Sequence, residues 1–405
     1  MPRPRIHRYT LFGLLYFTQG TILSYFTALN ALYFLSQGLT MTSVGIFASI
    51  ALIPFVVKIF LGMLSDRFNL FGMGYRKPYI LLGLAIQFIC LILAPFIDLR
   101  TGYWSFVALA FILQMGMALY DTCTDGLALD TTPIEEQGTI QGFMVGGRAV
   151  GVIVTASVVG LLAERATWFA VFWLLAGLTL LPLPLVLRMK EPERPAHRRF
   201  DWHAFRAFKQ PSVWLVAAVG LVSFLVMVGA NQLINPFIQQ TLQTGLSTAG
   251  FLTTFWGIGV VAGGVVGGRM SGKIGLEKGI WLGLSLVTVS LLMISRLVGS
   301  TSGMPVIFVL VIFFGLAYGV YQTTIFALAM RHTEAAIAAS MFAILMAFIN
   351  VGQGVGLGVG GVLVDRLGYP TTIAGFALIN LLVIPLMLFL WRRSRLANNP
   401  ALSQG

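Results

Sequence analysis

Four charged side chains lie within apolar stretches of membrane length: Lys58, Asp121, Asp125 and Arg148. A charge in the middle of a bilayer is costly, so such residues usually face a partner or a water-filled cavity. Basic side chains bind anionic groups, and carboxylates bind cations or take up protons. These residue types therefore predict either a site for a solute or a proton, or an ion-pair cluster that holds helices in register.

The spacing of these residues indicates which of them meet. Asp121 and Asp125 are four residues apart and share one helix face. Asp121 is expected about 12 Å from the inner end of its helix, and Arg148 about 13 Å along the next helix. A short loop joins these two helices, so they are expected to be antiparallel neighbours in which Asp121 and Arg148 pair. Lys58 is expected at a depth between the two aspartates.

The composition indicates the class of protein that contains these residues. Of the 405 residues, 57% are hydrophobic and only 10% are charged, whereas a soluble domain carries about 25% charged residues. Apolar runs of about 20 residues, each long enough to cross a bilayer as a helix, recur along the chain. The sequence therefore predicts an all-α integral membrane protein. Twelve spans are expected, at 9–35, 42–64, 78–97, 103–129, 139–162, 166–188, 212–238, 246–270, 278–298, 304–330, 337–363 and 371–391.

The net charge of +12 is explained by topology rather than by a nucleic-acid partner. With the N-terminus in the cytoplasm, most Lys and Arg residues fall on the cytoplasmic side, as the positive-inside rule requires. The loops on the outer side hold only Arg100, Arg165, Arg296 and Arg366. We therefore expect a multi-pass protein of the cytoplasmic (inner) membrane, with both termini in the cytoplasm.

One long polar segment, 189–211, divides the spans into two sets of six. The expected organisation is an N-terminal six-helix bundle at 1–188, a cytoplasmic linker at 189–211, and a C-terminal six-helix bundle with a short tail at 212–405. Two cysteines, Cys90 and Cys123, both lie within predicted spans and indicate neither a disulfide framework nor a metal site. We expect no cofactor.

The loop between the second and third spans carries a recognisable pattern. It reads Gly62-x-x-Ser65-Asp66-Arg67, followed by Gly74-Tyr75-Arg76-Lys77-Pro78. Together with the six-plus-six division, this pattern resembles the signature loop of the major facilitator superfamily, and it implies two six-helix bundles. The loop is longer than the common pattern and has Asn69 where a glycine is usual.

The resemblance also implies a cytoplasmic gate that opens and closes as the bundles move. Asp66 would supply the acid of this gate, and Arg67, Arg76 and Lys77 its bases. Asp130, at the end of the fourth span, is expected to partner Arg67.

Further motifs within residues 11–155 resemble the folate–biopterin transporter family. They are Gly13-Leu-Leu-Tyr-Phe17-x-Gln19-Gly20, Pro54-x-x-x-Lys58, Asp121-x-x-x-Asp125-Gly126, Gln141 and Arg148-x-x-Gly151. Muropeptide and acetyl-CoA permeases share the lysine, the aspartates and the arginine, and PucC-type carriers share part of the pattern. The resemblance implies a carrier whose leading cargo is pterin-like or folate-like, with muropeptides, sugars or tetrapyrroles as alternatives.

The second half offers polar residues without charge. We expect Asn231, Gln322 and Asn350 to face Gln19 and Tyr25 of the first span across a central cavity. Each of them could instead make a hydrogen bond between helices.

We expect a secondary carrier, a monomer, that works by alternating access. The sequence has no ATP-binding P-loop, so energy would come from a gradient. Lys58 and Arg148 suggest an anionic solute, and Asp121 or Asp125 suggests proton coupling.

The main alternative to a carrier is an enzyme, because Asp121-x-x-x-Asp125-x-x-x-x-Asp130 resembles the metal-binding motif of membrane prenyltransferases. The second acidic cluster that such enzymes need is missing, so no enzymatic activity is expected. A non-transporting assembly factor or sensor on a carrier scaffold remains open, whereas no ring of repeated residues indicates a channel.

Overall fold

The computed structural model describes residues 5–133, 136–189, 191, 210–298, 303–332 and 338–398. All regular structure in these ranges is helical. The chain forms two compact units, Met1–Arg199 with Asn235–Gly257, and Phe200–Ile234 with Ile258–Gly405. The domain boundaries expected from the sequence remain a prediction.

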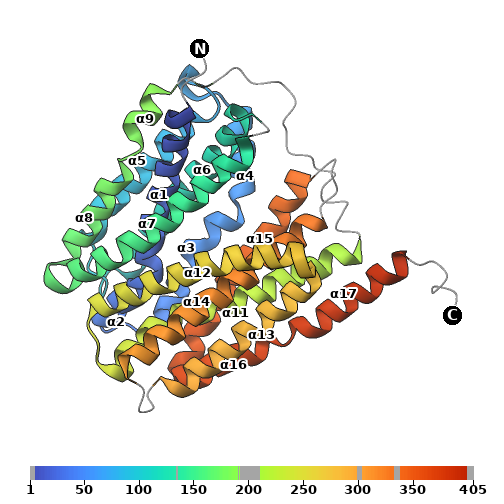
Figure 1. The fold of residues 1–405 in the computed structure, drawn as a ribbon. Coiled ribbons are helices and arrows are strands. Elements are labelled where there is room, and N and C mark those ends of the chain that lie inside the picture. Colours follow the sequence, from blue (N-terminus) through green and yellow to red (C-terminus); the bar gives the residue numbers. More distant parts are fainter. Residues whose placement is uncertain are drawn as a thin grey trace. The chain divides into compact units, whose positions relative to one another are not determined.

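The first unit contains α1 to α9 (Figure 1). These helices carry the four charged residues of the apolar stretches, Lys58, Asp121, Asp125 and Arg148, which we call the membrane-level charges. The helices are joined by short turns, two of which are 3₁₀ helices, Leu70–Gly72 and Ala94–Phe96. The helices are α1 (Arg5–Ala28), α2 (Asn30–Ser36), α3 (Met41–Val56), α4 (Lys58–Arg67), α5 (Lys77–Leu93), α6 (Tyr103–Thr131), α7 (Gln137–Arg165), α8 (Trp168–Thr179) and α9 (Leu183–Arg188).

The second unit contains the later helices. Two of them, α11 and α12, also contribute residues 235–257 to the first unit. The helices are α11 (Pro211–Leu242), α12 (Leu246–Ile274), α13 (Leu276–Leu297), α14 (Met304–Arg331), α15 (Ala338–Leu367), α16 (Tyr369–Asn380) and α17 (Val383–Asn398).

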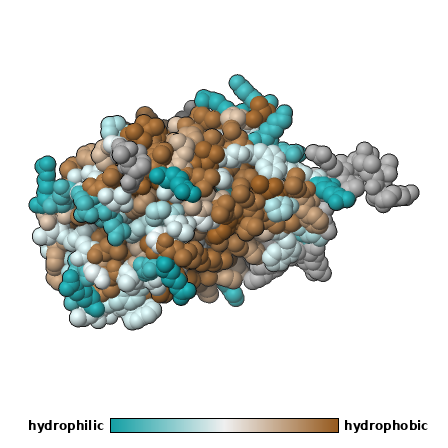
Figure 2. Space-filling view, turned by 90° about the horizontal axis from the view of Figure 1, so that it is seen from below, coloured by the Kyte–Doolittle hydropathy of each residue, from teal (hydrophilic) through white to brown (hydrophobic). Residues whose placement is uncertain are grey.

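Within the described residues, eleven helical segments are long and apolar enough to cross a membrane. The predicted first span, 9–35, is helical but is not one of the eleven, and it breaks at Leu29 between α1 and α2. Large apolar side chains such as Phe60, Trp104 and Val309 are exposed. Figure 2 shows broad apolar areas on one face, with hydrophilic residues in separate groups. Surface of this kind is suited to contact with lipid.

The second predicted span is two helices, and a proline lies shortly before the break. Pro54 lies inside α3, where it has no backbone N–H to donate to the preceding turn. The chain departs from helical geometry at Val57, and α4 begins at Lys58. The Pro54-x-x-x-Lys58 motif therefore places the lysine at the start of a new helix.

Small residues bring α1 and α7 into backbone contact (Figure 1). A methyl group at Gly147 would overlap the Gly13 carbonyl, and one at Gly20 would overlap the Arg148 carbonyl. Such contacts let two helices pack more closely than larger side chains allow. The backbone that carries Arg148 is therefore fixed against α1.

Candidate functional site: a charged cluster and a loop network

The four membrane-level charges, with Tyr16 and Gln19, form one group that we call the charged cluster. At its centre is Asp121, whose side chain is only 6% exposed. Lys58 Nζ lies 3.4 Å from Asp121 Oδ2, and Gln19 Nε2 donates a 2.9 Å hydrogen bond to Asp121 Oδ1. Both carboxylate oxygens of Asp121 are thus engaged. Three separate helices, α1, α4 and α6, supply these side chains.

The second carboxylate has a different partner. The Tyr16 hydroxyl donates a hydrogen bond to Asp125 Oδ1. Asp125 lies one turn from Asp121 on α6, and Tyr16 lies one turn from Gln19 on α1. The hydrogen-bond partner of Asp125 is thus a neutral phenol, whereas the ion-pair partner of Asp121, Lys58, is a cation.

Arg148 is the exception in the charged cluster. Its side chain is exposed, and it makes no hydrogen bond or ion pair with the described residues. It is close enough for its charge to act on Lys58 and Asp125. The structure pairs Asp121 with Lys58 instead of the expected Arg148. The guanidinium therefore remains available, and its planar fork suits a carboxylate or a phosphate.

A second group lies around the loop between α4 and α5, and we call it the loop network. It consists of Ser65, Arg76, Lys77, Asp130 and Glu191. The Arg76 side chain is buried, with Nη1 2.5 Å from Ser65 Oγ and Nε 3.6 Å from Asp130 Oδ2. A buried charge needs such a partner. The loop network thus joins α4, α5 and α6.

The partner of Asp130 differs from the expected one. Asp130 pairs with Arg76, whereas Arg67 is exposed and its guanidinium lies 5.7 Å from the Phe68 ring centre. The reason is position, since Arg67 ends α4 while Arg76 reaches back toward α6 from the start of α5. The side chain of Asp66 lies outside the described residues, so its role in the gate remains a prediction.

Glu191 completes the loop network from beyond the end of α9. Its carboxylate accepts backbone N–H groups from Tyr75, Arg76 and Lys77 at 2.8–3.0 Å. These groups form the start of α5, where free N–H donors and the helix dipole favour an anion. Gly74 has φ +113°, and a methyl group there would collide with this carboxylate. Only glycine meets both conditions.

Lys77 holds the same two elements together from the other side. Its Nζ donates to the carbonyls of Leu187 and Met189 at 2.7 and 2.9 Å. These carbonyls lie at the end of α9, where unpaired C=O groups favour a cation. The start of α5 is therefore paired with the negative charge of Glu191, and the end of α9 with the positive charge of Lys77.

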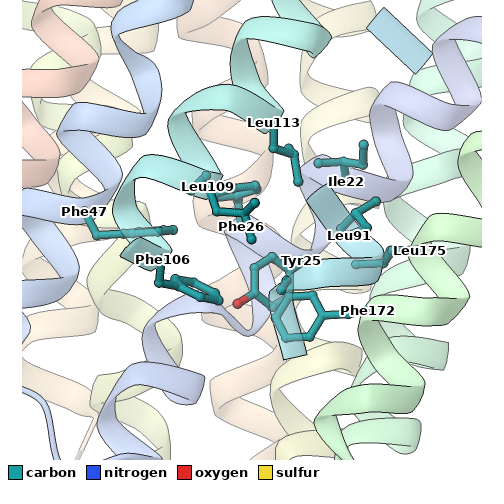
Figure 3. Close-up of a pocket in the computed structure, with 12 residues that line it drawn as sticks. Ile22, Tyr25, Phe26, Phe47, Leu91, Phe106, Leu109, Leu113, Phe172 and Leu175 are labelled. Carbon is teal, nitrogen blue, oxygen red and sulfur yellow. The ribbon is translucent and has the colours of Figure 1, made fainter. Parts of the chain in front are cut away.

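Tyr25 lies in an apolar cavity of the first unit (Figure 3). The cavity measures about 20 Å³, which is room for about one water molecule. Phe26, Phe47, Phe106 and Phe172 are among the residues that line it. The Tyr25 hydroxyl is buried without a hydrogen-bond partner in the described part of the chain. The expected role of Tyr25 in binding remains a prediction.

The predicted polar residues of the second half belong to the second unit. Asn350 is buried and accepts a 3.0 Å hydrogen bond from Gln353 Nε2. Asn231 and Gln322 are half-buried. Their expected roles in binding also remain predictions.

Three contacts were not predicted from the sequence: the hydrogen bond of Tyr16 to Asp125, that of Arg76 to Ser65, and the binding of the start of α5 by Glu191. Tyr16 had a usable signal, because it lies one helical turn before Gln19. Glu191 had almost none, since it reads as part of a polar linker. No three His, Cys, Asp or Glu side chains converge as a metal site in the described ranges.

Comparison with known proteins agrees with this architecture. The profile of the Major Facilitator Superfamily matches residues 11–243 and 217–405. The chain belongs to the major facilitator superfamily. Among solved structures, the nucleoside transporter NupG has a TM-score of 0.78 at 15% identity, covering 95% of this chain and 98% of that chain. A bacterial homologue of the human lysosomal transporter Spinster gives 0.68 at 15% identity, covering 95% and 94%. The all-α major facilitator fold expected from the sequence is confirmed.

Curated relatives of this major facilitator chain include transporters of several kinds. The sialic acid transporter NanX of Escherichia coli is 27% identical over 56% of this chain and 54% of its own length. The human synaptic vesicular amine transporter is 26% identical over 85% and 66%. The folate-biopterin transporter of Synechocystis is 27% identical over 47% and 41%. The chain therefore covers only about half of the length of NanX and about two thirds of the length of the amine transporter. These matches support the superfamily broadly and the folate–biopterin branch only weakly.

Proposed function

We propose that this protein is a secondary carrier that moves a small organic acid across the cytoplasmic membrane by alternating access. The observation that carries the proposal is Arg148, an exposed guanidinium without an ion pair to the described residues, beside a compact ion-paired group. Superfamily membership and the names of the curated relatives support the carrier class. Among those relatives, one is named for sialic acid and one for folate and biopterin, whereas the vesicular amine transporter, which matches more of the chain, is named for amines. The exposed guanidinium favours the acid over the amine, with pterin-like or folate-like acids first.

Uptake into proteoliposomes tests the proposal. Wild-type protein should accumulate folate or pterin-6-carboxylate, and Arg148→Ala should reduce the apparent affinity by about 10- to 100-fold, the usual value of a charge-assisted hydrogen bond. Arg148→Lys keeps the charge and should retain part of the affinity. Unchanged affinity in Arg148→Ala would contradict an anionic solute. Retained pigment or protein partner without any uptake would favour the assembly factor or sensor.

We also propose that Asp125 carries the coupling proton. Its hydrogen-bond partner in the charged cluster is neutral Tyr16, whereas Asp121 is paired with Lys58. Asp125→Asn should abolish accumulation driven by a pH gradient while solute exchange at equal concentrations continues. Asp121→Asn serves as the comparison and should impair exchange as well, because it leaves Lys58 without its anion. Full gradient-driven accumulation by both variants would exclude proton coupling through this pair.

A further inference from the structure

The face of α6 that carries the two aspartates also carries a third polar side chain. Gln114 precedes Asp121 by seven residues, which is two turns and about 10 Å along the helix. It also precedes Asp125 by eleven residues, so all three lie on one stripe of α6. Gln114 is buried, and its Oε1 has no hydrogen-bond partner within the described ranges.

Gln19 also has a side-chain amide oxygen without a hydrogen-bond partner among the described residues. Gln19 uses its Nε2 to bind Asp121, which fixes the orientation of the amide and leaves Oε1 as an acceptor. This Oε1 is also buried without a partner in the described residues. Leaving a buried amide oxygen unpaired is unfavourable. Buried amide oxygens usually have a protein group or an ordered water as their partner, so these two oxygens have capacity left for a donor.

Contacts between the helices place α1 beside this stripe. Tyr16 meets Asp125 and Gln19 meets Asp121, so α1 and α6 run antiparallel with their polar faces together. Beyond these pairs, Phe26 of α1 and Leu113 of α6 line the same cavity. Gln114 therefore continues the line of site residues toward the start of α6, away from the loop network.

We propose that Gln19 and Gln114 form a subsite that binds the N–H or O–H donors of the solute while Arg148 binds its acidic group. The inference rests on the proposed transport of an organic acid and narrows it to acids that carry hydroxyl, amine or ring N–H groups. Unsubstituted aliphatic or aromatic acids would bind Arg148 but leave both amide oxygens unpaired. The charged cluster would then discriminate by hydrogen bonding.

Binding to the purified full-length chain, measured by isothermal titration calorimetry, tests this subsite. Two pairs of acids serve as probes, matched in charge and ring size: pterin-6-carboxylate with naphthalene-2-carboxylate, and quinate with cyclohexanecarboxylate. Wild-type protein should prefer the donor-bearing member of at least one pair by about tenfold or more. Gln114→Leu should reduce this preference to about threefold or less while changing the affinity for the unsubstituted acid by less than about twofold.

Gln87 provides the matched control. It is fully buried on α5 with both polar atoms unpartnered among the described residues, yet it is not on the stripe of α6. Gln87→Leu should keep the full preference of wild-type protein. Equal binding of both members of each pair would overturn the subsite even if Arg148→Ala abolished binding. An unchanged preference in Gln114→Leu would overturn it as well. Binding of none of the four acids would overturn the acidic solute on which the inference rests.

Discussion

The charged cluster and the loop network both combine acidic and basic side chains in the first unit, but they differ in how their charges are paired. In the loop network, buried Arg76 donates a hydrogen bond to Ser65 and forms an ion pair with Asp130, and Glu191 accepts N–H groups from the start of α5. In the charged cluster, Arg148 makes no ion pair with the described residues. A network in which the charges are paired with one another holds helices together. A charge without an ion-pair partner can still bind a ligand.

The difference also concerns solvent. Arg76 and Asp130 are each 8% exposed at the side chain, whereas in the charged cluster Asp121 is 6% exposed but its partner Lys58 is 31% exposed, and Arg148 is exposed as well. Breaking a buried ion pair leaves a charge that water cannot solvate. We therefore expect substitutions in the loop network to change mainly stability, and those of the exposed bases in the charged cluster to change mainly binding.

Arg76→Ala gives the largest expected effect on stability. It leaves Asp130 buried without its guanidinium, which should lower the free energy of unfolding by about 3–5 kcal/mol. Denaturation of the purified protein in detergent measures this. Arg67→Ala is the control, because Arg67 is an exposed arginine of the same loop and should cost less than about 1 kcal/mol. Equal losses of unfolding free energy in Arg76→Ala and Arg67→Ala would contradict a special structural role for the buried arginine.

Glu191→Gln should have an intermediate effect. The amide keeps one acceptor oxygen but loses the negative charge at the start of α5, and it directs an NH₂ group toward backbone donors. The expected loss is about 1–3 kcal/mol in the free energy of unfolding, measured in the same way, with little change in solute affinity. A large loss of solute affinity with unchanged stability would show that Glu191 acts in solute binding and not in stabilising the loop network.

Arg148→Met should have the smallest effect on stability. An exposed cation without an ion pair contributes little, so the free energy of unfolding should change by less than about 0.5 kcal/mol. The same variant should bind acids poorly, for the reason given for Arg148→Ala. If instead its stability fell as far as that of Arg76→Ala, the charged cluster would be a structural group like the loop network.

The sequence predicted the fold because membrane helices follow from apolar length, and each predicted span coincides with helix within the residues that the structure describes. It did not predict where helices break. The break at Val57 depends on how Pro54 is accommodated within α3, and the break at Leu29 has no proline or glycine to announce it. Local composition specifies that a segment is helical more reliably than where its axis changes.

For the candidate site, the residue types were predictable and the partners were not. Depth along a helix matched Asp121 with Arg148, but depth does not determine which way a side chain points. The break at Val57 puts Lys58 at a helix start, from which it reaches Asp121. In the same way, Asp130 pairs with Arg76 rather than Arg67 because rotation about α4 and α5 decides the contact.

The backbone contact between Gly20 and Arg148 has a consequence for selectivity. Gln19 and Arg148 stand on two helices whose main chains touch, so backbone packing sets where the two side chains begin. Asp121 then holds the amide of Gln19 in place. Arg148 has no such partner among the described residues, and its long side chain keeps several rotatable bonds. One end of the site is therefore preformed and the other adaptable, so acids of different lengths can engage both groups.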